Sequence, residues 1–181
     1  MSEVTGGVVR AIRGDITTVT ADAMVNAANS HLAGGGGVDG AIHRTGGRGI
    51  MAELRERYDG CPTGSAVVTG AGRLPARHLV HAVGPRWRDG TGGEPELLRS
   101  AYRRAFELAA ECDSATVVSP SISTGIYGFP IAEAAPIGVE EARRALARPG
   151  TPLREITFAL FSEADLAVFT RALDGHPGAE G

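Results

Sequence analysis

The sequence predicts an α/β fold in which a sheet lies between layers of helices, and three observations predict it. Short runs rich in β-branched residues alternate with longer helical stretches along the chain. The 181 residues, of which 43% are hydrophobic, are enough to bury one core. Glycine is frequent, with 26 residues and no Gly-X-Y period, which indicates tight turns between elements. We therefore expect one domain over residues 1–173 and a disordered tail over residues 174–181.

The predicted strands are short β-branched runs, each followed by glycine, proline or polar residues that favour turns. In chain order they span residues 8–13, 23–26, 66–69, 78–83, 116–119 and 156–161. The predicted helices lie between or after these runs. In chain order they span residues 38–58, 94–111, 131–147 and 163–173.

Two of the helices carry more specific expectations. The first is expected to break at Gly46-Gly47, because glycine is a poor helix former. The second is the clearest, because apolar residues recur in it at steps of three and four and form one stripe that should face the core. The stripe consists of Leu97, Ala101, Ala105, Leu108 and Cys112.

The composition excludes several classes of protein. The net charge of −3 and a pI near 6.0 do not indicate a nucleic-acid substrate or an anionic membrane surface. All 18 basic residues are arginine, which excludes a Schiff-base lysine and a P-loop lysine. Two cysteines cannot build a disulfide framework, and no apolar run is long enough for a signal peptide or a membrane span. We expect a cytoplasmic monomer with reduced thiols and no membrane partner.

A run of four glycines, residues 34–37, lies between a predicted strand and a predicted helix. Without side chains, this backbone can approach a ligand closely and direct successive N–H groups at one anion, and the helix that follows adds its positive end. A flexible surface linker is the alternative, which the immediate start of a helix disfavours. Gly35, Gly37 and Gly40 also match G-x-G-x-x-G, but this fingerprint should follow its strand directly, and a dehydrogenase would need a substrate domain.

Polar residues flank the glycine run on both sides. Asp39 and His43 are four residues apart and share one helix face, where a carboxylate and an imidazole could orient or deprotonate water. A helix-start aspartate and a core histidine are an equally good interpretation. Asn26 and Asn29 are either turn residues or amides offered to sugar hydroxyls.

A second loop, residues 119–130, again leaves a strand and precedes a helix. Two such loops can flank one crevice at the carboxyl ends of the strands. Ser121 and Ser123 do not lie in G-x-S-x-G, so a nucleophile elbow is not supported. His78 and His81 are three apart on a strand and therefore face opposite sides, so we predict no metal site.

These motifs, in this order, resemble macrodomains of the MacroD type over nearly the whole chain to about Leu173. The motifs are Gly14-Asp15-Ile16-Thr17, Asn26-Ala27-Ala28-Asn29, residues 34–43 and Ser123-Thr124-Gly125-Ile126-Tyr127-Gly128-Phe129-Pro130. The resemblance implies a three-layer α/β/α fold with a central mixed, mostly parallel sheet. It also implies binding of ADP-ribose, removal of mono-ADP-ribose from acidic side chains of modified proteins, and deacetylation of O-acetyl-ADP-ribose. One departure is Thr45-Gly46, where the family pattern has alanines.

The resemblance assigns roles by matching motif. Asp15 would accept from the adenine amino group, Ile16 would line that pocket, and Phe161 would pack against adenine. Asn29 and Asp39 would face the distal ribose, with Asp39 positioning the attacking water and His43 assisting it. Backbone N–H groups would wrap the diphosphate, and a close approach at Gly125 would leave no room for a side chain. These N–H groups belong to Gly35, Gly36, Gly37, Val38, Ser123, Thr124, Gly125, Ile126 and Tyr127.

The leading interpretation is therefore a hydrolase that needs no metal or other cofactor. A pure ADP-ribose reader would use the same pocket without turnover, and the presence of both Asp39 and His43 favours the enzyme. A phosphatase acting on ADP-ribose-1″-phosphate would also use this pocket. The sequence does not indicate which protein is the target or which linkage is preferred.

Overall fold

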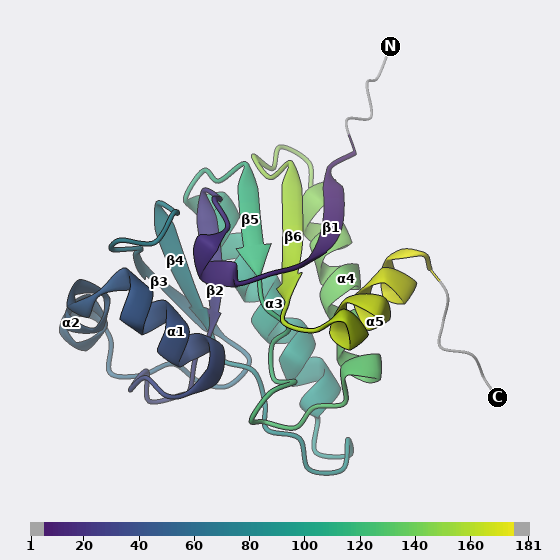
Figure 1. The fold of residues 1–181 in the computed structure, drawn as a ribbon, viewed down its shortest axis with the longest axis horizontal. Helices are drawn as coiled ribbons and strands as arrows, with labels where there is room; N and C mark the ends of the chain where they lie inside the picture. The colour runs from purple at the N-terminus through teal and green to yellow at the C-terminus, as the bar shows by residue number, and fades with distance from the viewer. Residues whose placement is uncertain (1–5, 176–181) are drawn as a thin grey trace.

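The computed structural model describes residues 6–175 as a mixed six-stranded sheet with helices on both faces (Figure 1). The strand order is β1-β6-β5-β2-β4-β3, and every neighbouring pair is parallel except β3 and β4. The strands are β1 Val8–Arg13, β2 Ala23–Ala27, β3 Ala66–Gly70, β4 His78–Ala82, β5 Thr116–Ser119 and β6 Glu155–Leu160. The mixed, mostly parallel sheet between helix layers is confirmed.

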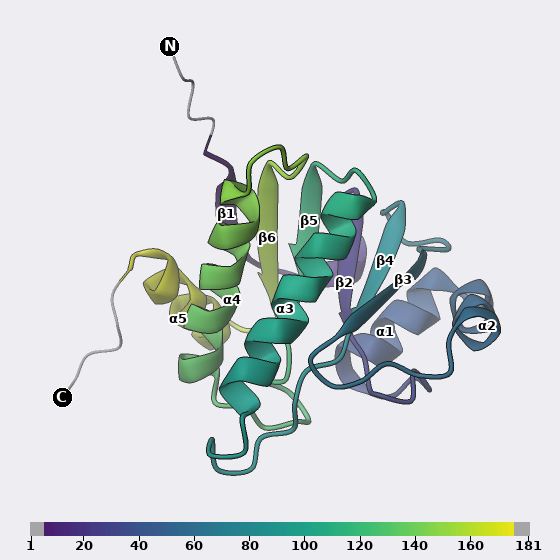
Figure 2. The ribbon, with the colours of Figure 1, turned by 180° about the vertical axis from the view of Figure 1, so that it is seen from behind.

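The helices form the two outer layers. They are α1 Gly37–Gly46, α2 Arg48–Arg57, α3 Glu94–Glu111, α4 Ile131–Ala147 and α5 Glu163–Leu173. The first two cover one face of the sheet, while α3 and α4 cross the other face (Figures 1 and 2). The last helix, α5, packs against α4 and β1 at one edge of the sheet. Residues 176–181 lie outside the described residues, whereas Asp174 and Gly175 still hydrogen-bond to the last turn of α5.

The break expected at Gly46-Gly47 separates α1 from α2. Gly47 has φ +93°, a conformation that glycine adopts without the steric cost other residues carry. A Cβ added to Gly46 would clash with Ile50 and lie 3.3 Å from the Leu74 side chain. The departure from the family pattern at Thr45-Gly46 therefore shapes the junction of the two helices.

The stripe predicted for α3 is only partly correct. Ala101, Ala105 and Leu108 are buried, but Leu97 and Cys112 are half-buried. This helix packs against both the sheet and α4, so a wider arc of its surface is covered. The stripe omitted four further residues of this helix that are buried, namely Leu98, Tyr102, Phe106 and Ala109.

The elements that the sequence did not predict are small. A single 3₁₀ turn, Ile16–Thr18, follows β1. Within residues 6–175, none of the helices combines the length and the apolar character that a membrane span requires.

Candidate active site

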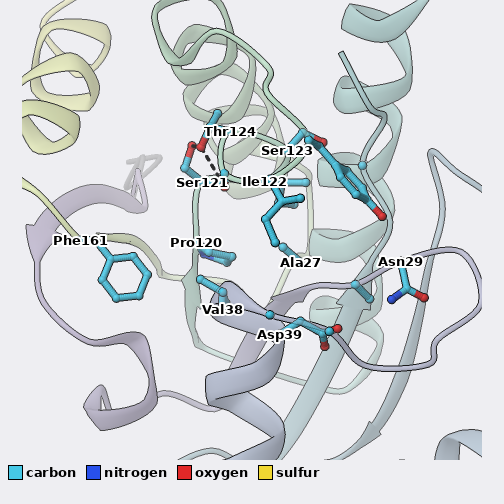
Figure 3. Close-up of a pocket in the computed structure, with 18 of the residues that line it drawn as sticks. Ala27, Asn29, Val38, Asp39, Pro120, Ser121, Ile122, Ser123, Thr124 and Phe161 are labelled. Carbon is cyan, nitrogen blue, oxygen red and sulfur yellow. Dashed lines mark hydrogen bonds between the residues drawn. The ribbon is translucent and has the colours of Figure 1, made fainter. Parts of the chain in front are cut away.

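A cavity of about 350 Å³ opens where three parallel strands end (Figure 3). The glycine loop after β2, the loop after β5 and the residues that follow β6 form its walls. Phe161 lies at one end, and Asn29 and Asp39 lie at the other. This position outside the carboxyl ends of the strands is where open α/β sheets bind ligands, and the two loops predicted to flank one crevice do so.

The glycine loop brings the start of α1 directly to the cavity. A Cβ added to Gly40 would lie 2.6 Å from the carbonyl oxygen of Gly35, so glycine is required where the helix passes the loop. No side chain caps the first turn of α1 in the described chain, and Gly36, Gly37 and Val38 line the cavity. The free N–H groups of this turn and the positive end of the helix favour an anion there.

Asn29 and Asp39 border the same space beside Gly35. A Cβ added to Gly35 would lie 3.5 Å from Asp39 Oδ2 and 3.9 Å from Asn29 Nδ2. The Asn29 amide also holds the loop, because Nδ2 donates to the Gly34 carbonyl at 2.9 Å and Oδ1 accepts from the Ala33 N–H at 3.2 Å. Asn29 is therefore a turn residue that also lines the cavity, and its binding of sugar hydroxyls stays a prediction.

The Asp39 carboxylate is buried on the side away from the cavity. Its Oδ1 accepts from Asn26 Nδ2 at 2.8 Å and lies 3.3 Å from His43 Nε2. Asn26 and His43 therefore lie behind Asp39 and do not line the cavity. With Oδ1 occupied from behind, Oδ2 is the oxygen that remains toward Gly35 and the cavity.

The loop after β5 supplies a second row of N–H groups. Ser123 has φ +68°, an uncommon conformation for a residue with a side chain, and its carbonyl accepts from the Phe129 N–H at 2.9 Å. In the described chain, the backbone N–H groups of residues 123–127 meet no protein acceptor. The loop rests on Tyr102, whose hydroxyl accepts from the Ile122 N–H at 2.9 Å. Burial raises the pKa of the Tyr102 hydroxyl above its usual value, so the group that supports the loop stays neutral.

No arginine lines the cavity among the described residues, although the chain has 18. The centre of the site is therefore suited to an anion held by main-chain N–H groups and a helix dipole rather than by side-chain cations.

Two large apolar side chains of the cavity wall are exposed. Ile126 is 80% exposed and Phe161 is 62% exposed, and both line the cavity. Large exposed apolar groups at the mouth of a cavity favour a flat, apolar part of a ligand. Next to them, Arg86 stacks on the Tyr127 ring, with the guanidinium carbon 4.8 Å from the ring centroid.

Asp15 and Ile16 do not line the cavity. Asp15 is exposed and its Oδ1 accepts from the backbone N–H and the hydroxyl of Thr17, at 2.9 and 2.7 Å. Ile16 is buried in the core. Both follow β1, whose last residue pairs with Leu160, so they lie near the Phe161 end of the site.

The sequence missed several residues that line the cavity. Gly84 packs so closely on Ser123 that an added Cβ would clash with the Ser123 hydroxyl. Asp165 lies in the first turn of α5, shortly after the last strand, and none of the motifs in the sequence included it. The other missed residues that line the cavity are Ala27, Ala28, Pro120, Ser121, Ile122, Ala159 and Leu160.

A buried polar cluster lies behind Asp39. Asn26 Nδ2 lies 3.2 Å from His81 Nδ1, and His81 Nε2 lies 2.9 Å from Thr69 Oγ1. Burial, and secondarily the neighbouring His43, lower the pKa of His81 to about 4, so the ring is neutral near pH 7. His78 and His81 point to different sides of the sheet, as expected, and no group of metal-binding side chains occurs in residues 6–175.

Comparison with known proteins shows that the chain is similar to others over most of its length. The family model described as Macro domain matches residues 25–138. An O-acetyl-ADP-ribose deacetylase of Pantoea vagans is 48% identical over 166 residues, covering 90% of this chain and 96% of the relative.

Two solved structures are similar over most of this chain. The Oceanobacillus iheyensis macrodomain with ADP has a TM-score of 0.87 and 37% identity, and the match covers 96% of this chain and 94% of that one. The Trypanosoma brucei macrodomain in complex with ADP-ribose has a TM-score of 0.84 and 37% identity, and the match covers 91% of this chain and 68% of that one.

Proposed function

Because the chain belongs to the Macro domain family, we propose that it binds ADP-ribose in this cavity and hydrolyses the bond between the distal ribose and an acyl group. The acyl group is the modified carboxyl of an aspartate or glutamate side chain. One observation carries this proposal: a centre lined by free N–H groups and no cation continues directly into the space bordered by Asn29 and Asp39.

The centre of the cavity fits a diphosphate. The first turn of α1 and the N–H groups of residues 123–127 lie on opposite walls, so oxygens held between them accept hydrogen bonds from both sides. The solved macrodomains named above, which hold ADP and ADP-ribose, support the same occupant here.

At the open end, the adenine would lie against Phe161. An exposed aromatic ring offers a stacking surface, and stacking on a base contributes about 1–3 kcal/mol. Asp15 and Ile16 lie just beyond this end, and Asp15 Oδ2 keeps an acceptor for the adenine amino group while Oδ1 binds Thr17.

At the closed end, Asp39 would position the attacking water. As the water oxygen bonds to the anomeric carbon, its proton passes to Asp39 Oδ2, the bond from that carbon to the acyl oxygen breaks, and the carboxylate leaves. Asn29 would bind the ribose hydroxyls, since an amide offers both a donor and an acceptor. His43 lies behind Asp39, which favours a role in orienting the carboxylate over donation to the leaving group.

Deacetylation of O-acetyl-ADP-ribose needs the same site, because an acetyl ester on the distal ribose would lie in the same space. The name of the Pantoea vagans relative supports this activity. Both substrates share an ADP-ribose that carries an acyl group at its distal ribose.

A panel of linkages tests the proposal. Proteins carrying ADP-ribose on glutamate, serine or arginine, together with O-acetyl-ADP-ribose and ADP-ribose-1″-phosphate, would be incubated with the enzyme with and without EDTA. We expect release from the glutamyl linkage and from the acetyl ester, and no effect of EDTA.

The other outcomes separate the alternatives. Binding of ADP-ribose without release from any substrate would identify a reader module. Release of phosphate alone would identify a phosphatase, and loss of turnover in EDTA would contradict the metal-independent mechanism.

A further inference from the structure

The cluster behind Asp39 forms a chain of buried side chains that crosses three strands and ends at the carboxylate. Thr69 comes from β3, His81 from β4 and Asn26 from β2, and none is more than 2% exposed. Asn26 and His81 are register partners in the parallel pair of β2 and β4, so their side chains lie next to each other on one face of the sheet. That face is the one α1 covers.

The hydrogen bonds that link these side chains all have a defined donor and acceptor. An ionised carboxylate only accepts, so the atom of Asn26 that meets Asp39 Oδ1 at 2.8 Å must be the amide nitrogen. The same nitrogen carries a second hydrogen, and it lies 3.2 Å from His81 Nδ1, which must then accept. His81 therefore carries its hydrogen on Nε2 and donates to Thr69 Oγ1 at 2.9 Å, and the Thr69 hydroxyl donates to the Gly70 carbonyl at 2.8 Å.

The orientation of the Asn26 amide depends on these two contacts alone. Its Oδ1 is buried and has no hydrogen-bond partner among the described residues. If the amide rotated by half a turn, Oδ1 would face the Asp39 carboxylate and repel it. His81 Nδ1 is thus the one group, besides Asp39 itself, that sets which side of the amide faces the carboxylate.

We propose that His81 is a positioning residue: as the neutral Nε2–H tautomer, anchored by Thr69, it fixes the Asn26 amide on Asp39 Oδ1 and leaves Oδ2 for the attacking water. This role rests on the proposed function of Asp39. The neutral ring agrees with the depressed pKa of His81, which is caused first by burial and then by His43. The other charged or titratable groups near the ring are Asp39 and Glu53.

Two isosteric variants test the role of Nδ1. In His81→Asn the side-chain amide lies near the position of Nδ1 and can accept from Asn26, whereas in His81→Gln it lies near Nε2 and contacts Thr69 alone. We expect His81→Gln and His81→Phe to lower kcat roughly 10-fold, the factor that about 1.4 kcal/mol of hydrogen bonding represents. We expect His81→Asn to recover most of this loss, and the Kd for ADP-ribose to stay within about 2-fold in all three.

His78 provides a matched control. It is a half-buried histidine on the same strand, three residues away, and outside the chain of hydrogen bonds. His78→Gln should leave kcat and Kd unchanged. Thermal unfolding of each variant shows whether it is folded, and a His81→Asn variant no more active than His81→Gln at equal stability would overturn the proposal.

A second measurement does not depend on turnover. The ¹⁵N NMR spectrum of the ligand-free protein reports the tautomer of His81, assigned by its loss in His81→Asn. We expect the Nε2–H form in the wild type and a mixture of tautomers in Thr69→Val, which lacks the acceptor that anchors Nε2–H. An Nδ1–H tautomer in the wild type would refute the chain of donation, whereas full activity of Asp39→Ala would refute the proposed function and leave the tautomer result standing.

Discussion

The two ends of the cavity are formed by different kinds of side chain, polar at one end and apolar at the other. At the Asp39 end, the buried Asn26 and the half-buried His43 contact one carboxylate oxygen from behind. The end at Phe161 presents an exposed aromatic ring in place of buried polar side chains. Under the proposed function, the closed end performs chemistry that needs fixed geometry, and the open end supplies binding area that tolerates small displacements.

The largest expected effect is at the closed end. Asp39→Ala should lower kcat by about 10²–10⁴-fold, the contribution expected of a general base, and change the Kd for ADP-ribose far less. His43→Ala should lower kcat less, because His43 contacts Asp39 Oδ1 from behind and does not line the cavity. Steady-state kinetics on glutamyl-linked ADP-ribose and calorimetry with ADP-ribose measure the two quantities. Wild-type turnover in Asp39→Ala would contradict the proposal that the Asp39 end of the cavity is the catalytic one.

Gly125→Glu tests the centre of the cavity, between the ends. Among the described residues, no protein atom lies within 4 Å of a Cβ added to Gly125, so the close approach expected here is one between the backbone and the diphosphate. The variant should therefore fold, and repulsion of a diphosphate by the new charge should weaken binding by roughly 100-fold or more. Gly125→Ala is the uncharged control and should bind nearly as the wild type does. Normal calorimetric binding by folded Gly125→Glu would place the phosphates elsewhere.

Phe161→Ala should produce the opposite pattern to Asp39→Ala. Loss of the exposed ring should raise the Kd for ADP-ribose about 10-fold, in line with the contribution of one stacked base, and leave kcat at saturation unchanged. Phe161→Tyr keeps the ring and should bind normally. If Phe161→Ala lowered kcat without changing Kd, the open end would not be a binding surface.

The smallest effect is expected at Asp15. Because Oδ1 is already bound by Thr17, Asp15→Ala should weaken ADP-ribose binding by only about 5-fold, which corresponds to roughly 1 kcal/mol. The same variant removes the cap of the 3₁₀ turn and should lower the thermal midpoint. Asp15→Asn keeps an acceptor and should separate the two effects: a Kd equal to that of Asp15→Ala would assign the loss to the charge.

The sequence predicted what local patterns determine. All six strands and the helix break at Gly46-Gly47 follow from β-branched runs and from glycine conformational preferences, and both were confirmed. The buried face of α3 was partly wrong, because contact with α4 widens that face and no periodicity within one helix contains this information.

The parts of the site that depend on local composition were also predictable. Glycine and small polar residues indicated the loops at residues 34–37 and 123–127, and both loops contribute to the cavity wall. The position of His81 against Asn26 could not be predicted, because it depends on the register of two strands whose residues are 55 apart in the chain. A single histidine in a strand carries no local sign of such a partner.

The free N–H groups of the loop after β5 have a consequence for hydrogen exchange. Main-chain amides that meet no protein acceptor exchange with solvent deuterium readily, even when the surrounding backbone is well ordered. In the ligand-free protein, residues 123–127 should therefore label rapidly beside a slowly labelling β5. An oxyanion bound across the loop would slow their exchange without any change of fold, so occupancy of the cavity can be read from the protection of one short peptide.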